Sequence, residues 1–181
     1  MKKFELTNEF ITNMFGTKLF RIRALVEFGD VEAGELGGYV EKESNLGHDD
    51  NAWVYGDARV YGNARVYGDA RVYGDAQVSG DAWVSGNARV YGDAGVYGAA
   101  QVSGDALVCG DGDYAYAHGF GSVNRTTTFF RLKDGGVGVR CGCFYGTLPE
   151  FRDKIRETHG ETKKAQEHLM LADLMKLRFE K

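Results

Sequence analysis

The chain has 181 residues, of which 43% are hydrophobic and 27% are charged, and its net charge at pH 7 is −4. This balance predicts a soluble chain long enough to bury a core, and it contains no apolar run of the ~20 residues that a membrane-spanning helix needs. The acidic balance also argues against binding to duplex nucleic acid, because proteins that bind it carry basic patches.

Residues 1–38 are expected to form an N-terminal β cap. Residues 4–6 and 18–26 have the composition of strands, and glycines punctuate the stretch up to Gly38. The end of a repeat structure exposes its hydrophobic interior and its unpaired strand edges, so a covering segment is needed there. We therefore expect this segment to close one end of the repeat that follows.

A six-residue repeat dominates residues 39–122. From Asn51 to Gly110 the sequence repeats Val-Tyr-Gly-Asp-Ala-Arg with small variations, and an alanine stands two residues before each valine. The recurring valines are Val54, Val60, Val66, Val72, Val78, Val84, Val90, Val96, Val102 and Val108. A period of six scatters apolar residues around a helix but places Ala and Val on one side of a short strand. Gly-Asp or Gly-Asn follows nearly every strand and favours a tight corner.

Three such strands close one triangular coil, so the repeat predicts a mainly β fold, a left-handed parallel β-helix of hexapeptide repeats. Val40 and Leu46 place an imperfect coil before the regular repeat, with a loop at residues 47–50. Tyr114 and Phe120 continue the six-residue spacing, which predicts about four and a half coils.

Residues 123–181 are expected to form a C-terminal β-hairpin plus two helices. Segments 123–132 and 137–145 flank Lys133-Asp134-Gly135-Gly136, a turn sequence. Thr147 and Glu150 form a capping-box pattern, which predicts a first helix that ends near Gly160. A second helix is expected over about 161–179, and its apolar arc is wider than one packed face requires. We therefore expect a homo-oligomer, a dimer or a trimer, formed through the C-terminal helices.

The three cysteines, Cys109, Cys141 and Cys143, cannot all pair within one chain and do not form the disulfide framework of a secreted protein. The chain also opens without a charged-then-apolar leader, so we expect a cytoplasmic location. Cys141 and Cys143 alternate with Val137 and Val139 on one expected strand face, which favours buried apolar cysteines over metal ligands. We expect no cofactor and no metal.

Side chains at the same position of every third repeat should stack in columns on the outside of the coil. One outer face then carries Trp53, Tyr55, Arg71, Tyr73, Arg89 and Tyr91. Aromatic faces stack on planar groups and arginine pairs with oxyanions, so this face predicts a binding site for a nucleotide-like ligand. The alternative is that these residues cover an exposed sheet or meet a partner subunit.

The chain resembles a known group. Arg21-Ile22-Arg23-Ala24-Leu25, Phe28-Gly29-Asp30-Val31, Gly37-Gly38-Tyr39-Val40-Glu41 and Asn45-Leu46, together with the repeat, resemble hexapeptide-repeat proteins of bacteria, phages and prophages. Such proteins are often labelled acyltransferases or polymer-forming proteins. The resemblance covers roughly residues 18–110 and implies the β-helix fold.

For an acyltransferase, the resemblance implies an acyl-coenzyme A donor and a histidine that acts as general base. The regular repeat contains no histidine, so the candidates are His48, in the expected loop, and His118, near the end of the coil. We favour a non-catalytic, phage-like binding protein that captures a nucleotide-like ligand or inhibits a host defence protein. An acyltransferase and a structural, self-assembling β-helix are the alternatives.

Overall fold

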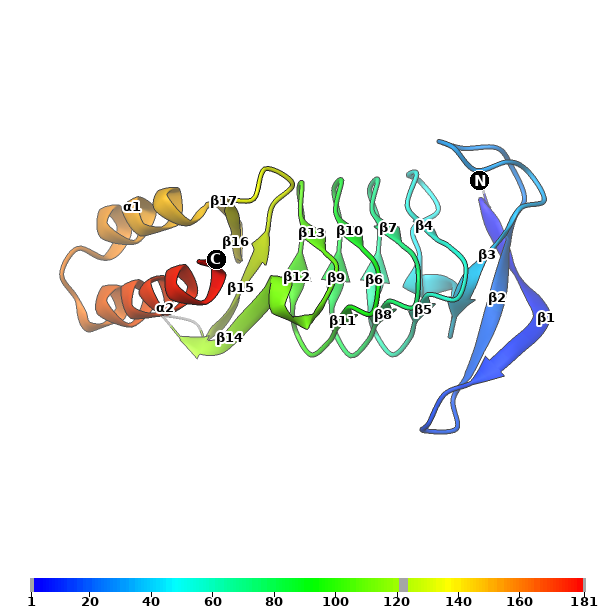
Figure 1. Ribbon diagram of the computed structural model, residues 1–181, viewed down its shortest axis with the longest axis horizontal. Helices are drawn as coiled ribbons and strands as arrows, with labels where there is room; N and C mark the ends of the chain where they lie inside the picture. Colours follow the sequence, from blue (N-terminus) through cyan, green and yellow to red (C-terminus); the bar gives the residue numbers. More distant parts are fainter. Residues whose placement is uncertain (1, 121–123, 181) are drawn as a thin grey trace.

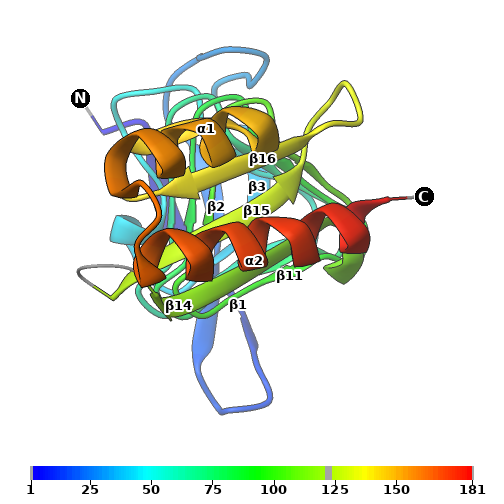
Figure 2. The ribbon, with the colours of Figure 1, turned by 90° about the vertical axis from the view of Figure 1, so that its left-hand side faces the viewer.

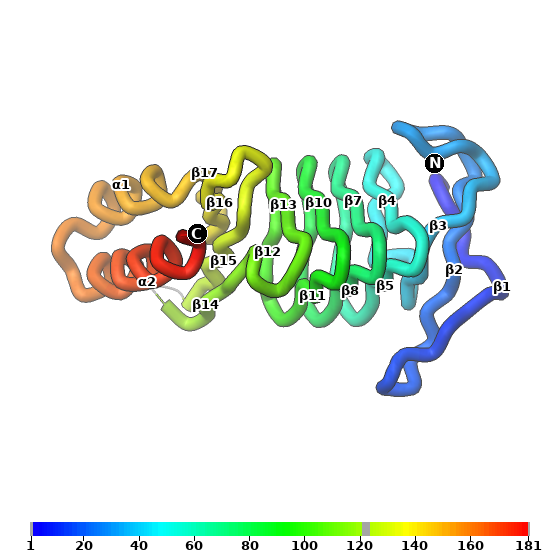
Figure 3. Tube along the Cα trace, in the orientation of Figure 1, coloured from blue at the N-terminus to red at the C-terminus, as the bar shows by residue number. Residues whose placement is uncertain are grey.

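The computed structural model describes residues 2–120 and 124–180. A stack of coils occupies the middle of an elongated molecule, with an N-terminal hairpin at one end and two helices at the other (Figure 1, Figure 3). The fold is mainly β, as the composition and the repeat predict.

Ten strands of two residues each form the regular part of the coil. They are β4 (Trp53–Val54), β5 (Arg59–Val60), β6 (Arg65–Val66), β7 (Arg71–Val72), β8 (Gln77–Val78), β9 (Trp83–Val84), β10 (Arg89–Val90), β11 (Gly95–Val96), β12 (Gln101–Val102) and β13 (Leu107–Val108). Each pairs in parallel with the strand three positions along, so that Arg71 lies between Trp53 and Arg89. The predicted β-helix, its coil of three repeats and its stacked columns are confirmed.

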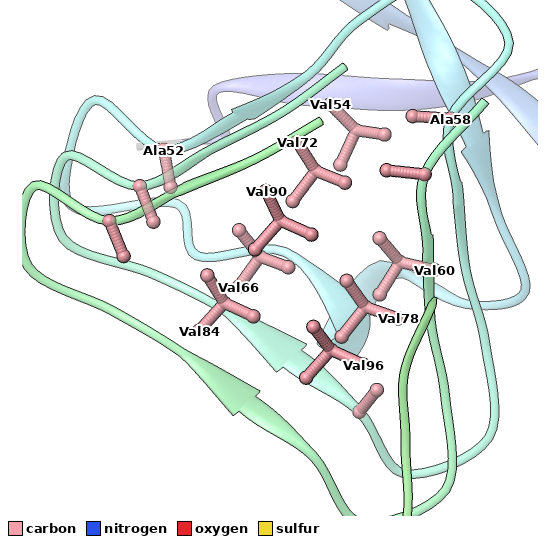
Figure 4. Close-up of a cluster of buried hydrophobic side chains, with 14 of the residues drawn as sticks. Ala52, Val54, Ala58, Val60, Val66, Val72, Val78, Val84, Val90 and Val96 are labelled. Atoms are coloured by element: carbon pink, nitrogen blue, oxygen red, sulfur yellow. The ribbon is translucent and has the colours of Figure 1, made fainter. Parts of the chain in front are cut away.

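The repeated alanines and valines fill the interior of this coil. Figure 4 shows Val54, Val72 and Val90 pointing inward from one face of the triangle, toward valines of the other two faces. Every valine of the repeat is fully buried. Burying one valine side chain contributes roughly 1.5–3 kcal/mol, so this stack is the main source of stability in the middle of the molecule.

Corner glycines let adjacent coils approach closely. Gly86 has a φ of +65°, and a Cβ placed on it would lie 2.8 Å from the backbone nitrogen of Gly104 in the next coil. Any other residue would therefore meet both a strained backbone conformation and a clash with the neighbouring coil.

The N-terminal segment is continuous with one face of the coil. β1 (Phe4–Thr12) and β2 (Lys18–Ala24) form an antiparallel hairpin, and β3 (Leu36–Val40) pairs with β2 on one side and with β5 on the other. The hairpin extends beyond the outline of the coil (Figure 1). Its tip exposes Met14 and Phe15, by 90% and 76% of their surface.

The irregular first coil contains the predicted loop at residues 47–50. A short 3-10 helix (Glu43–Asn45) precedes Leu46, which bridges to Val66 in parallel. The loop is tied to the N-terminus by Lys3, whose buried ammonium donates to the backbone carbonyls of Asp50 and Ala52, 2.8 Å from each. The loop therefore lies against the N-terminal strand β1.

The regular coil ends at Val108, earlier than the spacing predicts. A 3-10 turn (Asp111–Asp113) redirects the chain, and β14 (Tyr114–Phe120) pairs antiparallel with β15 (Arg125–Arg131). The predicted continuation of the coil through Phe120 is therefore wrong. Tyr114 keeps the inward position of the repeat and is buried against the last coil, which explains why the spacing persists at that residue.

The C-terminal strands form a sheet of four rather than a hairpin. Its order is β14-β15-β16-β17, with β16 at Val137–Cys141 and β17 at Phe144–Thr147. The predicted turn at residues 133–136 joins β15 to β16, and a second turn at Gly142 divides the long strand expected over 137–145. Val123, the expected start of the first strand, lies outside the described residues.

Two helices pack side by side against this sheet (Figure 2). They are α1 (Leu148–His159) and α2 (Lys163–Phe179), close to the predicted ranges. The predicted capping box is present, because Thr147 accepts from the backbone N–H of Glu150 while the Glu150 carboxylate accepts from that of Thr147. On α2 the exposed residues Met170, Leu174 and Leu177 form one apolar stripe.

The prediction that Cys141 and Cys143 are buried on one strand face is wrong. Cys141 ends β16 and is half-buried, whereas Cys143 lies in the following turn and is exposed. The turn at Gly142 interrupts the strand, so the alternation that the sequence shows does not continue through it.

Candidate functional site

The predicted aromatic and basic side chains stand on the outside of the sheet that β4, β7, β10 and β13 form. We call Tyr55, Arg71, Tyr73, Arg89 and Tyr91 the Tyr/Arg face. The rings of Tyr73 and Tyr91 stack nearly parallel, with centroids 5.0 Å apart and an interplanar angle of 8°. Hydrogen bonds between coils hold this spacing, since the Tyr73 N–H donates to the Val90 carbonyl at 3.0 Å.

Trp53 does not belong to this face. The N-terminal segment covers it, so that Trp53 is fully buried and packs edge-on against Phe4 and Phe28, at centroid distances of 6.1 and 5.3 Å. The prediction that Trp53 binds ligand is corrected by this packing. The column position was right, but the cap covers the first coil at Trp53, whereas Tyr55, two residues further on, keeps part of its surface in solvent.

Asp30 of the N-terminal segment reaches the Tyr/Arg face. Its carboxylate accepts a hydrogen bond from the Tyr55 hydroxyl at 3.0 Å and lies 2.7 Å from Nη1 of Arg71. Partial burial and the hydrogen bond to Asp30 raise the pKa of Tyr55 to about 12. Tyr55 is therefore a neutral hydrogen-bond donor at physiological pH, and Arg71 is oriented by a carboxylate.

Two shallow pockets open on this face and share both arginines. Asp30, Tyr55, Arg71, Tyr73 and Arg89 line the first, of about 320 Å³. The second, of about 270 Å³, lies toward a corner of the coil, and its polar lining consists of Asp69, Arg71, Asn87, Arg89, Asp105 and Lys133. Within residues 2–120 and 124–180, Arg89 takes part in no ion pair. Its guanidinium is therefore the charge on this face most accessible to an anion.

The two histidines proposed as general bases lie at opposite ends of the coil. Nδ1 of His48 accepts the backbone N–H of Lys3 at 3.2 Å, and its ring stacks on Phe4 at a centroid distance of 4.4 Å. This arrangement is typical of a histidine that fixes a loop, because its lone pair is already used. His118 is exposed on β14, with Nδ1 2.9 Å from the Thr126 hydroxyl.

Sequence reasoning missed two residues of the site, Asp30 and Lys133. Asp30 is 41 residues from Arg71 in the chain, and no local pattern predicts that contact. Lys133 belongs to the turn between β15 and β16, and that turn docks on the last coil, where the Lys133 N–H donates to the Asp105 carbonyl at 3.1 Å. Both contacts depend on how the capping segments fold back onto the coil.

One protein-family comparison matches the coil. The family described as the YdcK β-solenoid repeat matches residues 52–68, 64–80 and 82–98. These matches run from β4 to β11 and include all five residues of the Tyr/Arg face. The chain is thus a repeat β-helix protein, similar over this part to the YdcK solenoid repeat. No curated protein matches the chain.

In the parts of the chain that the structure describes, neither helix combines the length and the apolar character that crossing a bilayer requires.

Proposed function

We propose that the Tyr/Arg face of this protein is a non-catalytic binding site, which holds a small anionic ligand with a planar group, such as a nucleotide. The observation that carries the proposal is that Arg89, which has no ion-pair partner among the described residues, lines one pocket with Tyr73, whose ring stacks in parallel on that of Tyr91. Arginine binds phosphate through a charge-assisted fork, and aromatic rings stack on bases.

The first pocket favours this kind of ligand by its lining. Its volume of about 320 Å³ lies at the lower end of the range for small-molecule sites. Tyr55 and Tyr73 offer aromatic rings beside the two guanidinium groups, and Asp30 holds Arg71 from the other side. An incoming phosphate would compete with Asp30 for Arg71 but would meet no such competitor at Arg89.

The test is binding of nucleoside mono- and triphosphates, measured by calorimetry, together with native mass spectrometry of the protein as purified from cells. The double variant Arg71→Gln/Arg89→Gln should weaken binding at least tenfold, because each charged hydrogen bond contributes about 1.5–3 kcal/mol. The matched control is Arg59→Gln/Arg65→Gln, which removes the same residue type from the other two faces of the coil.

The control pair should bind as the unchanged protein does. Equal affinity of the Arg71/Arg89 pair and the control pair would contradict the proposal. The proposal would also be contradicted if the unchanged protein neither carried a nucleotide when purified from cells nor bound one in the calorimetric titration.

A protein partner is the second candidate, and the tip of the β1–β2 hairpin favours it. Met14 and Phe15 are among the most exposed large apolar residues of the described chain, at the point of the hairpin farthest from the coil. Exposed apolar side chains at such a tip mark contact sites for other proteins. On this alternative the protein inhibits a host protein, and Met14→Ser/Phe15→Ser should abolish co-purification of the target while nucleotide binding is retained.

The proposal extends to the group to which the protein belongs. The six-residue period of the coil supports membership of the hexapeptide-repeat proteins of bacteria and phages. A cytoplasmic place of action and a counter-defence role are proposed from that resemblance alone. An acyltransferase remains the enzymatic alternative, with His118 the better placed base because His48 is occupied by the Lys3 backbone. Acetyl transfer from acetyl-coenzyme A, abolished by His118→Ala, would favour that alternative.

A further inference from the structure

Beyond the coil, the C-terminal unit contains a pocket that the proposed binding function does not use. It has a volume of about 290 Å³ and lies between the end of the four-stranded sheet and the two helices. Its apolar walls include Phe120, Phe144, Phe151 and Ile155, and its polar lining includes Arg125, Cys141, Cys143, Lys154, His159 and His168. The pocket thus combines apolar walls, two cationic side chains and two thiols.

Cys141 is held at this pocket by the strand that pairs with its own. Thr127 of β15 stands directly opposite Cys141 of β16, and its buried hydroxyl donates to Sγ of Cys141 at 3.2 Å. Arg125 of β15 lies over Gly142, so close that a Cβ on that glycine would clash with its guanidinium. Because Gly142 has no side chain, the guanidinium of Arg125 can occupy this space and line the same pocket as Cys141.

His168 of α2 lines the same pocket as Cys141. It is only 4% exposed, and its Nδ1 lies 2.9 Å from the backbone carbonyl of Lys164. A carbonyl oxygen only accepts hydrogen bonds, so Nδ1 carries the hydrogen and Nε2 is the nitrogen left for Cys141. Phe151 and His159 fix the ring, at centroid distances of 6.0 and 6.2 Å.

The charges around the pair favour the thiolate. Burial alone would raise the pKa of the Cys141 thiol, but the nearby imidazole of His168, the hydrogen bond from Thr127 and the charge of Arg125 outweigh burial and lower it. The proximity of Cys141 raises the pKa of His168 in turn, against the effect of burial. Besides this pair, the titratable or charged groups around the site are Arg125 of β15, Cys143 of the β16–β17 turn, Lys154 and His159 of α1, Glu157 of α1, whose carboxylate lies 2.8 Å from Nζ of Lys154, and Glu167 of α2.

We propose that Cys141 is a nucleophile, with His168 as its base, in a pocket for a small acyl ester or thioester that carries an anionic group. A nucleophile beside a base that a third group orients is the arrangement on which cysteine catalysis depends. The apolar walls suit the acyl chain, and Arg125 and Lys154 suit a carboxylate or phosphate on the same molecule.

Within residues 2–120 and 124–180 no three His, Cys, Asp or Glu side chains are placed to hold a metal ion together.

The covalent step is acyl transfer to sulfur. Sγ of Cys141 forms a bond to the carbonyl carbon, and the thiol proton moves to Nε2 of His168. The bond from that carbon to the leaving oxygen or sulfur then breaks, and the leaving group takes the proton from His168. The products are a thioester on Cys141 and the free alcohol or thiol, without any change of oxidation state.

The first test compares the alkylation rates of the three cysteines in the folded protein by iodoacetate and iodoacetamide, mapped peptide by peptide. Cys143 and Cys109 are internal controls, since both are exposed and Asp113 raises the pKa of Cys109. At pH 6–7, where unperturbed thiols are almost fully protonated, we expect Cys141 to react at least about tenfold faster than Cys143. We also expect iodoacetate to be favoured over iodoacetamide at Cys141 alone.

Two substitutions separate the roles of the pocket. Arg125→Gln, at an exposed position, should slow iodoacetate at Cys141 by more than it slows iodoacetamide. His168→Gln should shift the pH profile of Cys141 alkylation upward and leave that of Cys143 in place. Because His168 is buried, thermal unfolding of His168→Gln is measured as well. If His168→Gln does not fold, the comparison of the two reagents on Arg125→Gln decides the outcome.

The second test is acylation by 4-nitrophenyl acetate and by 4-nitrophenyl hydrogen succinate, which adds a carboxylate. Intact mass and peptide mapping should show one acyl group on Cys141, with the succinate ester reacting faster, and Cys141→Ser should remove it. Reaction of Cys141 no faster than Cys143 with both reagent classes would overturn the proposal. Equal rates for the anionic and the neutral reagents would overturn the assignment of the anionic group.

Discussion

Asp30 and Arg71 join the N-terminal cap to the Tyr/Arg face, with Nη1 of Arg71 2.7 Å from Oδ2 of Asp30. Both side chains keep a substantial part of their surface in solvent, at 36% for Arg71 and 54% for Asp30. Exposed pairs of this kind contribute only about 0–1 kcal/mol to stability. The contact therefore matters more for the charge and orientation of Arg71 than for holding the cap in place.

Removal of this carboxylate should strengthen anion binding. In Asp30→Asn the guanidinium of Arg71 loses its competitor, so the Kd for a nucleotide should fall by about threefold, equivalent to ~0.7 kcal/mol. The free energy of unfolding should change by less than about 0.5 kcal/mol. Calorimetric titration and urea unfolding of both proteins measure the two quantities. Weaker binding in Asp30→Asn would mean that orientation of Arg71 by Asp30 matters more than competition.

Stability should fall at high pH through Tyr55. Its pKa is raised to about 12 in the folded protein, against about 10 for an unperturbed tyrosine. Because the folded state holds the proton more tightly, the contribution of Tyr55 is fully present below pH ~10 and is lost as the pH rises toward 12. Tyr55→Phe should flatten this part of the curve of unfolding free energy against pH.

Burial also raises the pKa of Tyr114, so the raised pKa of Tyr55 is assigned from the difference between the tyrosinate absorbance titrations of the unchanged protein and Tyr55→Phe. Asp30→Asn should lower it, because the hydrogen bond to Asp30 is one of its causes. Tyr67, on another face of the coil, provides the control substitution Tyr67→Phe. An unchanged high-pH curve in Tyr55→Phe would contradict the assignment.

Three glycine-to-alanine substitutions should separate backbone strain from crowding. Gly110 has an extended φ of −163° and open space around it, so Gly110→Ala should be neutral or stabilising by up to ~1 kcal/mol. Gly56 has a φ of +57° with equally open space, so Gly56→Ala should cost about 1–2 kcal/mol. Gly86→Ala should cost more than either, because it adds the clash with Gly104. Urea unfolding of the three variants gives the order, and any other order contradicts the packing of the corners.

The apolar stripe on α2 should determine the oligomeric state. Met170, Leu174 and Leu177 are exposed by 72%, 55% and 69%, and they lie on one side of the helix. The double variant Leu174→Glu/Leu177→Glu should therefore be a monomer at concentrations where the unchanged protein is a dimer or trimer. Sedimentation velocity measures this state, and Lys163→Glu, at the exposed start of α2, is the control. A monomeric unchanged protein would contradict the prediction of a homo-oligomer.

The predicted stacking of side chains in columns is confirmed, whereas the exposure expected at the first strand of the coil is wrong. Arg71 and Arg89 stack as their separation by three repeats requires. Trp53 occupies the same column but is buried, because Phe4 and Phe28 of the cap cover the first coil. The partner of Cys141 was missed for a similar reason, since His168 reaches it from α2, which lies beyond β17 and α1 in the chain.

The β-helix follows from the repeat alone, because each six-residue unit places Ala and Val inward and Gly at a corner without help from distant residues. Which parts of the coil face solvent, and which side chains meet at the two candidate sites, depends on long-range packing. Asp30, Lys133 and His168 reach those sites from capping segments whose docking depends on shape and burial along the whole molecule. Local periodicity encodes the interior of a repeat, whereas its surface chemistry depends on contacts between segments far apart in the chain.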